Sequence, residues 1–335
     1  MSPILAPEPQ KTAHRKAIKP LYKTTLGRLY CGDSISVLGS RSFNRLKGKV
    51  DLVFTSPPFP LNRKKRYGNL QGEEYVAWIA SLAPLLKDFL TKTGSIVIEL
   101  GNAWEPGQPT MSTLPLEALL AFKKAANLYL CQEFICFNPA RLPSPAQWVN
   151  VERIRVKDAF TRVWWMSAIP KPKADNTKIL TKYSKSMQDL LERGTYNSGI
   201  RPSEHNIGAK SFLTDNKGAI PPNVLVTPQD LTEVLSIANT RANDPYQTQC
   251  RENGWQAHPA RMPQKLVEFF IEFLTEPGDR VLDPFGGSNT TGWVAESLKR
   301  KWIGIEMNPE YAETSKIRFG LRCNLPKVSA DPSAS

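Results

Sequence analysis

The stretch that decides the fold is Val50–Phe59, VDLVFTSPPF in one-letter code. Its first five residues form a short apolar run, which predicts a buried strand. Two consecutive prolines cannot continue a sheet ladder, so the strand must end before Pro57 and Pro58. Pro57 also favours an extended backbone at Ser56. We therefore expect a rigid hydroxyl, a rigid carbonyl and the Phe59 ring at the carboxyl end of a strand, where open α/β sheets bind ligands.

These groups suit the chemistry of an exocyclic amine on a nucleobase. Such an amine is a poor nucleophile because its lone pair is delocalised into the ring. Acceptors at Ser56 and Pro57 that hold its hydrogens out of the ring plane would free the lone pair, and the Phe59 ring would hold the base by stacking. The same residues also fit a proline-terminated strand that leads into an ordinary loop, so the rest of the chain has to decide.

The overall composition points to an acidic partner. The chain has 335 residues, of which 41% are hydrophobic, enough for one large α/β domain with an insertion or for two domains. The formal net charge is +13, and nucleic acid is the simplest acidic partner for such a chain. The alternative is that the positive charge serves only solubility. Five cysteines without a CxxC pair indicate reduced thiols and a cytoplasmic location. No apolar run approaches the ~20 residues that span a bilayer, so no membrane partner is expected.

Strand and helix patterns alternate along the first half of the chain, as a doubly wound sheet requires. The stretch over 27–31 predicts a short strand that ends in Gly32 and Asp33, and Asp33 either caps the next helix or meets a ligand. A second strand over 96–100 places Glu99 at the same sheet edge as Ser56. The other elements expected here are helices over 73–90 and 114–126 and strands over 132–137 and 160–166.

The last third of the chain carries a second motif at a strand end. A strand over 280–283 runs into Pro284–Thr291, PFGGSNTT, and then into a helix over 292–298. The next strand ends in Glu306, 20 positions after Gly286, the separation at which a nucleotide-binding fold bonds a ribose. The full G-x-G-x-x-G pattern is missing. A dinucleotide enzyme stays possible on this motif alone, but a cofactor without pyrophosphate, such as S-adenosylmethionine, needs only this looser glycine turn.

Composition divides the chain into five segments. Residues 1–20 are rich in proline and basic residues and are expected to form a flexible basic arm, and residues 326–335 a disordered tail. Residues 169–255 are polar, basic and rich in loops, with few apolar runs for a core of their own. We interpret them as a target-recognition insertion between the two parts of one catalytic domain, 21–168 and 256–325.

Taken together, the motifs resemble those of the β-class DNA amino-methyltransferases, and in particular the PvuII-type cytosine-N4 methyltransferases of restriction-modification systems. The resemblance extends from about Leu21 to Leu321. Among the matching stretches are TSPPF at 55–59, IRVKDA at 154–159, HPAR at 258–261 and FGGSNTT at 285–291. The target-base motif precedes the cofactor motif, as in the β class. The resemblance therefore implies a Rossmann-like methyltransferase fold with a circularly permuted motif order, in which the two chain ends supply neighbouring strands.

The resemblance implies methyl transfer from S-adenosylmethionine to the N4 amine of a flipped cytosine in double-stranded DNA. Its catalytic residues would be Ser56, Pro57, Pro58 and Phe59, with Glu99 at the position where the PvuII type has an aspartate near the base. No metal ligand is expected. The family pattern prefers glycine at the position of Asn289, which leaves the contact there open. The residues implied to bind the cofactor are Asp33, Thr55, His258, Pro259, Asp283, Pro284, Phe285, Gly286, Gly287, Ser288, Asn289, Thr290 and Glu306.

Basic residues near these motifs are the candidates for binding DNA. We expect the run at 63–66 to grip phosphates, and the insertion together with the 138–158 loops to read the sequence. The expected partner is double-stranded DNA with a short palindromic site, bound by a monomer or a dimer. The chain would be the modification half of a type II system with a cognate endonuclease, or an orphan relative. The DNA-binding candidates are Arg63, Lys64, Lys65, Arg66, Arg141, Arg155, Lys157 and Arg201.

Three other activities remain open on the sequence. An N6-adenine methyltransferase uses the same fold, although serine rather than aspartate or asparagine at position 56 speaks against it. The others are a cofactor-binding DNA-binding module without catalysis and an RNA methyltransferase. The covalent cysteine route to cytosine C5 is excluded, because the chain has no Pro-Cys dipeptide. Trp164 and Trp165 either line the pocket of the flipped base or pack in the core.

Overall fold

The computed structural model describes residues 18–59, 70–208, 211–226 and 244–326. Nine strands in these ranges form one mixed sheet, and two more form a small separate sheet. In order across the main sheet they are β1 (Tyr22–Lys23), β2 (Gly27–Cys31), β11 (Lys301–Glu306), β10 (Arg280–Asp283), β3 (Val50–Thr55), β4 (Leu90–Gly101), β6 (Phe160–Ser167), β5 (Tyr129–Phe137) and β9 (Val224–Val226). The small sheet pairs β7 (Gly199–Ile200) with β8 (Asn206–Ile207).

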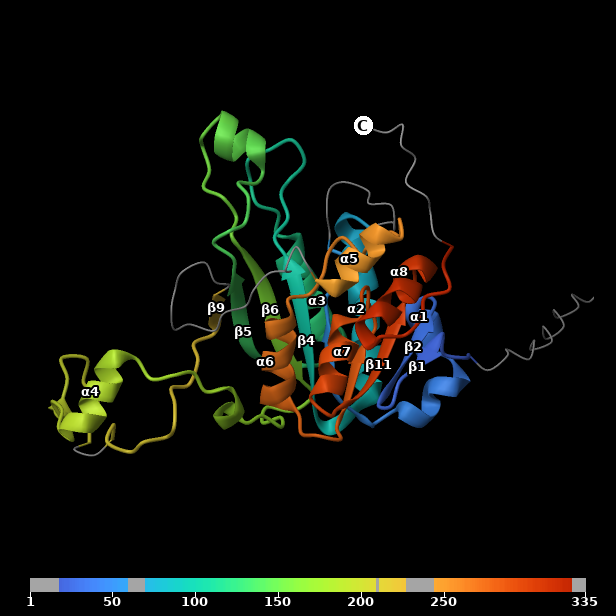
Figure 1. Cartoon of the computed structure of the whole chain (residues 1–335). Helices are drawn as coiled ribbons and strands as arrows, with labels where there is room; N and C mark the ends of the chain where they lie inside the picture. Colours follow the sequence, from blue (N-terminus) through green and yellow to red (C-terminus); the bar gives the residue numbers. More distant parts are fainter. Residues whose placement is uncertain (1–17, 60–69, 209–210, 227–243, 327–335) are drawn as a thin grey trace, which may run out of the picture.

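Helices cover both faces of the main sheet, which confirms the doubly wound α/β class (Figure 1). In that view α6 (Gln264–Leu274) and α7 (Thr290–Ser297) lie in front of the sheet, and α2 (Gly72–Phe89) and α3 (Leu114–Ala125) lie behind it. The shorter elements are α1 (Ser34–Leu38), α4 (Lys185–Arg193), α5 (Pro245–Glu252), α8 (Pro309–Thr314), the 3₁₀ turns η1 (Arg41–Leu46), η3 (Asn176–Ile179) and η4 (Ser315–Phe319), and the π turn η2 (Gln147–Val151).

Alternate residues of the central strands point into two separate cores, as strand geometry requires. In β3, Val53 packs on the side of α2 and α3, whereas Leu52 and Phe54 pack on the side of α6 and α7. Both faces are covered, which is why this strand reads as a continuous apolar run. Trp164 and Trp165 divide between the same two cores and are 1% and 8% exposed, so the interpretation of these tryptophans as core residues is confirmed.

The two ends of the chain meet in the middle of the sheet. β10 lies between β11 and β3 and is parallel to both, with Leu282 opposite Val53. β11 in turn pairs with β2 from the amino-terminal part. The expected permuted arrangement is therefore confirmed. The chain continues from β10 to β11 on one side and from β3 to β4 on the other. The connections after β10 and β3 therefore leave in opposite directions, and the crevice between the carboxyl ends of these two strands is where such sheets bind ligands.

Much of the 169–255 segment packs on the main domain. β9 pairs with β5 at the edge of the sheet, and Ile179 of η3 is buried in the core beneath α6. Tyr246 and Cys250 of α5 pack against Ile317 of η4. In contrast, α4 has no buried residue and lies apart from the sheet at the left of Figure 1. The target-recognition role of this segment and its exact limits stay a prediction.

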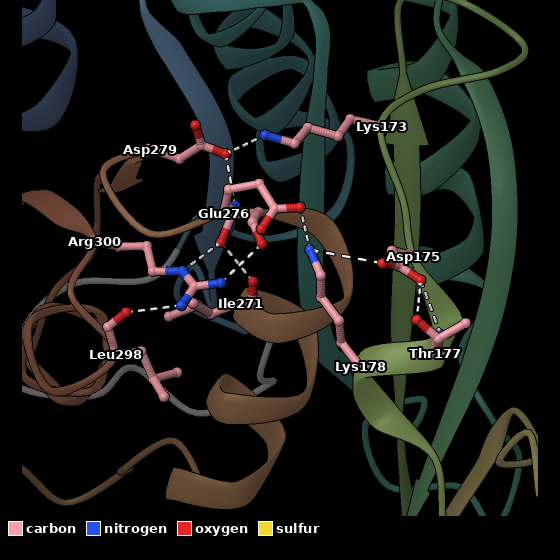
Figure 2. A network of polar contacts seen from close by, with 10 residues as sticks. Lys173, Asp175, Thr177, Lys178, Ile271, Glu276, Asp279, Leu298 and Arg300 are labelled. Carbon is pink, nitrogen blue, oxygen red and sulfur yellow. Dashed lines mark hydrogen bonds and ion pairs between the residues drawn. The ribbon is translucent and has the colours of Figure 1, made fainter. Parts of the chain in front are cut away.

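A polar network ties the start of this segment to the turns before β10 (Figure 2). Lys173 Nζ lies 2.5 Å from Asp279 Oδ2. Beside this ion pair the buried Arg300 donates to the carbonyls of Thr275 and Leu298, at 2.8 and 2.7 Å. These residues lie at the amino end of β10, so the network stabilises the end of the sheet opposite the ligand crevice.

Some expectations fall outside the described residues. The basic run Arg63–Arg66 is among them, as are residues 1–17 of the expected arm and residues 327–335 of the expected tail. Within the described ranges, no helix is both long and apolar enough to cross a membrane.

Candidate active site

A cavity of about 480 Å³ lies at the carboxyl ends of the central strands, a size typical of pockets for small organic ligands. The structure brings most of the expected site residues to its wall. Thr55, Pro259, Pro284 and Asn289 are neighbours in the chain that do not line it. The expected residues that do line it are Asp33, Ser56, Pro57, Pro58, Phe59, Glu99, Arg141, His258, Asp283, Phe285, Gly286, Gly287, Ser288, Thr290 and Glu306.

On the β3 and β4 side of the cavity, Ser56 is held by Glu99. The two strands pair in parallel with Thr55 opposite Ile98, which brings the next residue of each strand level. The Ser56 hydroxyl donates to the Glu99 carboxylate, and Thr161 Oγ1 donates to Glu99 Oε1 at 2.9 Å. Glu99 is only 9% exposed, and burial raises its pKa against the lowering effect of both hydrogen bonds. The pair is therefore a hydroxyl bound to a carboxylate of raised proton affinity.

The Phe59 ring rests on the end of β4. A β-carbon at Gly101 would lie 2.6 Å from this ring, so only glycine leaves room for it there. From the helix side Tyr75 and Trp78 of α2 line the same cavity, and the Trp78 ring centroid lies 5.6 Å from that of Phe285. These α2 aromatics pack in the core and form part of the cavity wall as well.

Asp283 braces the junction between the two halves of the site. Its Oδ1 accepts from Thr55 Oγ1 at 2.7 Å and from the Phe285 N–H at 3.0 Å, and its Oδ2 accepts from Thr291 Oγ1 at 2.7 Å. Burial raises the pKa of this carboxyl, and the three hydrogen bonds oppose the shift. Thr55 therefore acts through Asp283, by joining the end of β3 to the glycine turn.

Glu306 anchors the glycine turn at the end of β11. Its Oε2 accepts from the Gly287 N–H and its Oε1 from the Asn308 N–H, both at 2.8 Å. Gly287 has a φ of +53°, and a β-carbon there would meet the His258 ring at 3.0 Å. Both the backbone conformation and the neighbouring ring therefore favour glycine at this position. Burial raises the pKa of Glu306. Each carboxylate oxygen still has acceptor capacity for a ligand hydroxyl.

Asn289 stands at the position of the turn where the family pattern prefers glycine. Its φ is +55°, a left-handed conformation that asparagine tolerates better than other residues with a β-carbon. The buried side chain accepts from the Gly292 N–H at 3.1 Å and donates to the Tyr22 hydroxyl at 3.0 Å. It caps α7, so the structure uses it inside the fold rather than in the cavity wall.

A buried cluster beside the cavity was not singled out by the sequence motifs. One oxygen of Asp244 lies 3.5 Å from Arg261 Nη1 and 3.3 Å from Arg318 Nη2, and both arginine side chains are over nine-tenths buried. Arg318 also donates to the Ser288 carbonyl of the glycine turn at 2.8 Å. The HPAR stretch contained the signal for Arg261, whereas no motif marked Arg318.

Arg261 lines the cavity with hydrogen-bonding capacity to spare. Its Nε and Nη1 have no hydrogen-bond partner in the part of the chain that the structure describes. Burial lowers its pKa, Asp244 raises it, and Arg318 lowers it again. Two guanidinium groups share one carboxylate here, so this wall has a surplus positive charge. A buried charge of this kind needs an anionic partner, which a ligand carboxylate can supply.

The described cations that were expected to bind DNA have contacts within the chain. Arg141 lines the cavity and donates to a backbone carbonyl at 3.1 Å. Lys157 and Arg201 donate to backbone carbonyls at 2.6 and 2.8 Å. The Arg155 guanidinium lies 4.2 Å from the centroid of the Trp104 ring. Their binding to DNA stays a prediction.

Comparison with known proteins shows to which family the chain belongs. The family model described as DNA methylase matches residues 50–317, from β3 into η4. This chain belongs to the DNA methylase family. The methylase is 46% identical over 303 residues to the type II methyltransferase M.PvuII of Proteus hauseri, covering 90% of this chain and 86% of that protein. It is 24% identical over 294 residues to M.BglII of Bacillus subtilis, covering 87% and 68%.

Solved structures agree with this assignment. PvuII DNA methyltransferase, described as cytosine-N4-specific, matches with a TM-score of 0.70 and 41% identity over 92% of both chains. The M1.HpyAVI–SAM complex matches with a TM-score of 0.50 and 20% identity over 88% of this chain and 100% of that chain, which supports the fold alone. The resemblance to the PvuII type is confirmed.

Proposed function

We propose that this methylase transfers a methyl group from S-adenosylmethionine to the N4 amine of cytosine in double-stranded DNA. The observation that carries the proposal is the Ser56–Glu99 hydrogen bond beside Phe59, in one cavity with the glycine turn at Glu306. Similarity to a cytosine-N4-specific enzyme over 92% of the chain supports the choice of base. Serine at position 56 disfavours the alternative, N6-adenine transfer.

The cavity wall fits S-adenosylmethionine. Glu306 can accept from ribose hydroxyls, and Asp33, which uses one oxygen to accept from the Ser36 N–H at 2.8 Å, has the other for the adenine amino group. The surplus positive charge at Arg261 fits the carboxylate of the methionine part. The cofactor held by these residues would supply a methyl group on a sulfonium, and the sulfur would keep the electron pair of the carbon–sulfur bond as the new bond to N4 forms.

The protein's own groups prepare the amine for attack. The Ser56 oxygen and the Pro57 carbonyl accept its two hydrogens, which turns the lone pair out of conjugation with the ring. Because the Ser56 proton is already donated to Glu99, the serine oxygen is available as an acceptor. After transfer the nitrogen carries a surplus proton, and the raised pKa of Glu99 favours its uptake through Ser56. Phe59 stacks on the base and fixes its plane.

We further propose that the substrate is a short palindromic site and that the enzyme is the modification half of a type II restriction-modification system, or an orphan of one. The net charge of +13 and the similarity to a type II methyltransferase support this context. Residues 169–255 and the loops at 138–158 would read the site.

Methylome sequencing of DNA exposed to the protein and S-adenosylmethionine tests the proposal. We expect N4-methylcytosine at one short sequence. N6-methyladenine would overturn the choice of base, and unmodified DNA would overturn the activity. Ser56→Ala should retain cofactor and DNA affinity but lose roughly tenfold to a hundredfold in single-turnover rate, since one hydrogen bond to the reacting amine is removed. Ser81→Ala on the exposed side of α2 is the matched control.

A further inference from the structure

An excursion between β5 and β6, residues 138–159, rises from the rim of the cavity; we call it the finger. In Figure 1 it is the green segment that extends above the sheet. Its base belongs to the cavity, because Asn138 and Arg141 line the wall. The Asn138 N–H donates to the Ala159 carbonyl at 2.6 Å and closes the base of the finger. The position of the finger is therefore coupled to that of the active site.

The returning arm of the finger leaves two apolar side chains in water. Ile154 and Val156 are 59% and 87% exposed. Arg155 between them is half-buried, with its guanidinium 4.2 Å from the centroid of the Trp104 ring. The next residue, Lys157, is exposed and donates to a backbone carbonyl of the finger. An arm that turns an arginine onto the fold and leaves its apolar neighbours in water departs from the usual pattern, in which apolar groups are buried.

Two further apolar side chains of the finger, Leu142 and Val151, are 80% and 68% exposed. Four exposed apolar side chains within one segment of 22 residues are a mark of an interaction site. Residues 138–159 contain four Lys and Arg against two Asp and Glu, so the partner is acidic. Double-stranded DNA is acidic outside and apolar in its base stack, and its target base must reach the cavity at the foot of the finger.

We propose that Ile154 and Val156 enter the DNA duplex as an apolar wedge and hold the target base out of the stack. The inference rests on the proposed function, because it requires that a base leaves the duplex for the cavity. Apolar wedges are a known means of unstacking base steps. A wedge needs firm support, and the backbone provides it: the Ile154 and Arg155 N–H groups both donate to the Trp148 carbonyl, at 3.0 and 3.2 Å.

The test compares two unmodified duplexes that carry the sequence in which the enzyme methylates cytosine, as methylome sequencing identifies it. One has guanine opposite the target cytosine, and the other has an abasic position there, so that the cytosine is unpaired. The variant Ile154→Ala/Val156→Ala is measured against wild type and against Leu120→Ala, a matched control that removes a side chain 64% exposed on α3. Single-turnover rates are taken at saturating cofactor and DNA.

We expect the double variant to lose about tenfold or more on the paired duplex and less than about twofold on the abasic one, because an unpaired base costs little to extrude. Leu120→Ala should match wild type on both. Val156→Leu, which keeps an apolar side chain, should also match wild type, and this separates loss of the wedge from a general fault in the finger.

Three results would overturn the wedge. The first is a wild-type rate of the double variant on the paired duplex. The second is an equal loss on both duplexes, which would make the patch a general binding surface. The third is a wild-type dimer that the double variant cannot form in analytical ultracentrifugation, which would assign the patch to a second copy. If wild type methylates neither duplex, the proposed function itself fails, and the wedge with it.

Discussion

Replacing Glu99 by glutamine isolates the buried charge that holds Ser56. Glutamine has nearly the same size and retains one acceptor oxygen for the hydroxyl donors Ser56 and Thr161. The negative charge is lost, and an NH2 group replaces the second carboxylate oxygen. General-base assistance contributes roughly 10²–10⁴ in rate, and because Ser56 and Pro57 still orient the amine we expect a fall near the lower limit, on the order of a hundredfold.

The pH profile is the signature of this role. Burial raises the pKa of Glu99, and only the ionised carboxylate can accept the proton. The single-turnover rate of wild type should therefore rise with pH above the ordinary glutamate range and then level off, whereas Glu99→Gln should lack this rise. Glu133→Gln is the matched control, because Glu133 pairs with Arg162 at 2.8 Å and does not line the cavity. A wild-type rate and profile in Glu99→Gln would refute the role.

The same variant should gain stability relative to wild type as pH rises. The folded-state pKa of Glu99 is raised above its ordinary value of 4.5, so the folded state binds this proton more tightly than the unfolded state. The contribution is present below the unfolded pKa and is lost as pH rises through the folded pKa. Glutamine has no such loss. The melting temperature of Glu99→Gln minus that of wild type should therefore increase as pH rises above the ordinary glutamate range; a constant difference would contradict the assignment.

Three further substitutions test the cofactor side and the frame of the site. Arg261→Met should weaken S-adenosylmethionine binding about tenfold or more in calorimetry, because a charge-assisted contact is lost, and Arg261→Lys should recover part of it; equal affinities would contradict the carboxylate contact. Asn289→Ala should lower the free energy of unfolding by about 2 kcal/mol in urea titration, since it removes a cap and strains a left-handed residue, while Asn289→Gly should cost less. Arg300→Ala should cost about 2–3 kcal/mol by leaving the buried Thr275 carbonyl without its donor. Its kcat/KM should stay at the wild-type value below the melting temperature, because the network lies at the far end of the sheet; a kinetic defect would disprove that separation.

The sequence alone determined the class of fold, the order of the motifs and the chemistry expected at the strand ends. A double proline must end a strand, so the place of Ser56 followed from covalent geometry. Continuous apolar runs predicted the central strands, which are buried on both faces, and an acid 20 positions after Gly286 predicted a ribose site that stays to be tested. These signals are local: each depends on residues that are close together in the chain.

The tertiary structure alone decided which groups meet. The hydrogen bond from Ser56 to Glu99 depends on the register of β3 against β4, which periodicity does not specify. The shared carboxylate of Asp244 joins Arg261 to Arg318 from separate segments. The exposure of Ile154 and Val156 likewise goes with a tertiary contact, that of Arg155 between them with the ring of Trp104. A sequence pattern reports where a strand ends and which face is apolar, but the partner of a buried polar group is set by packing between distant elements.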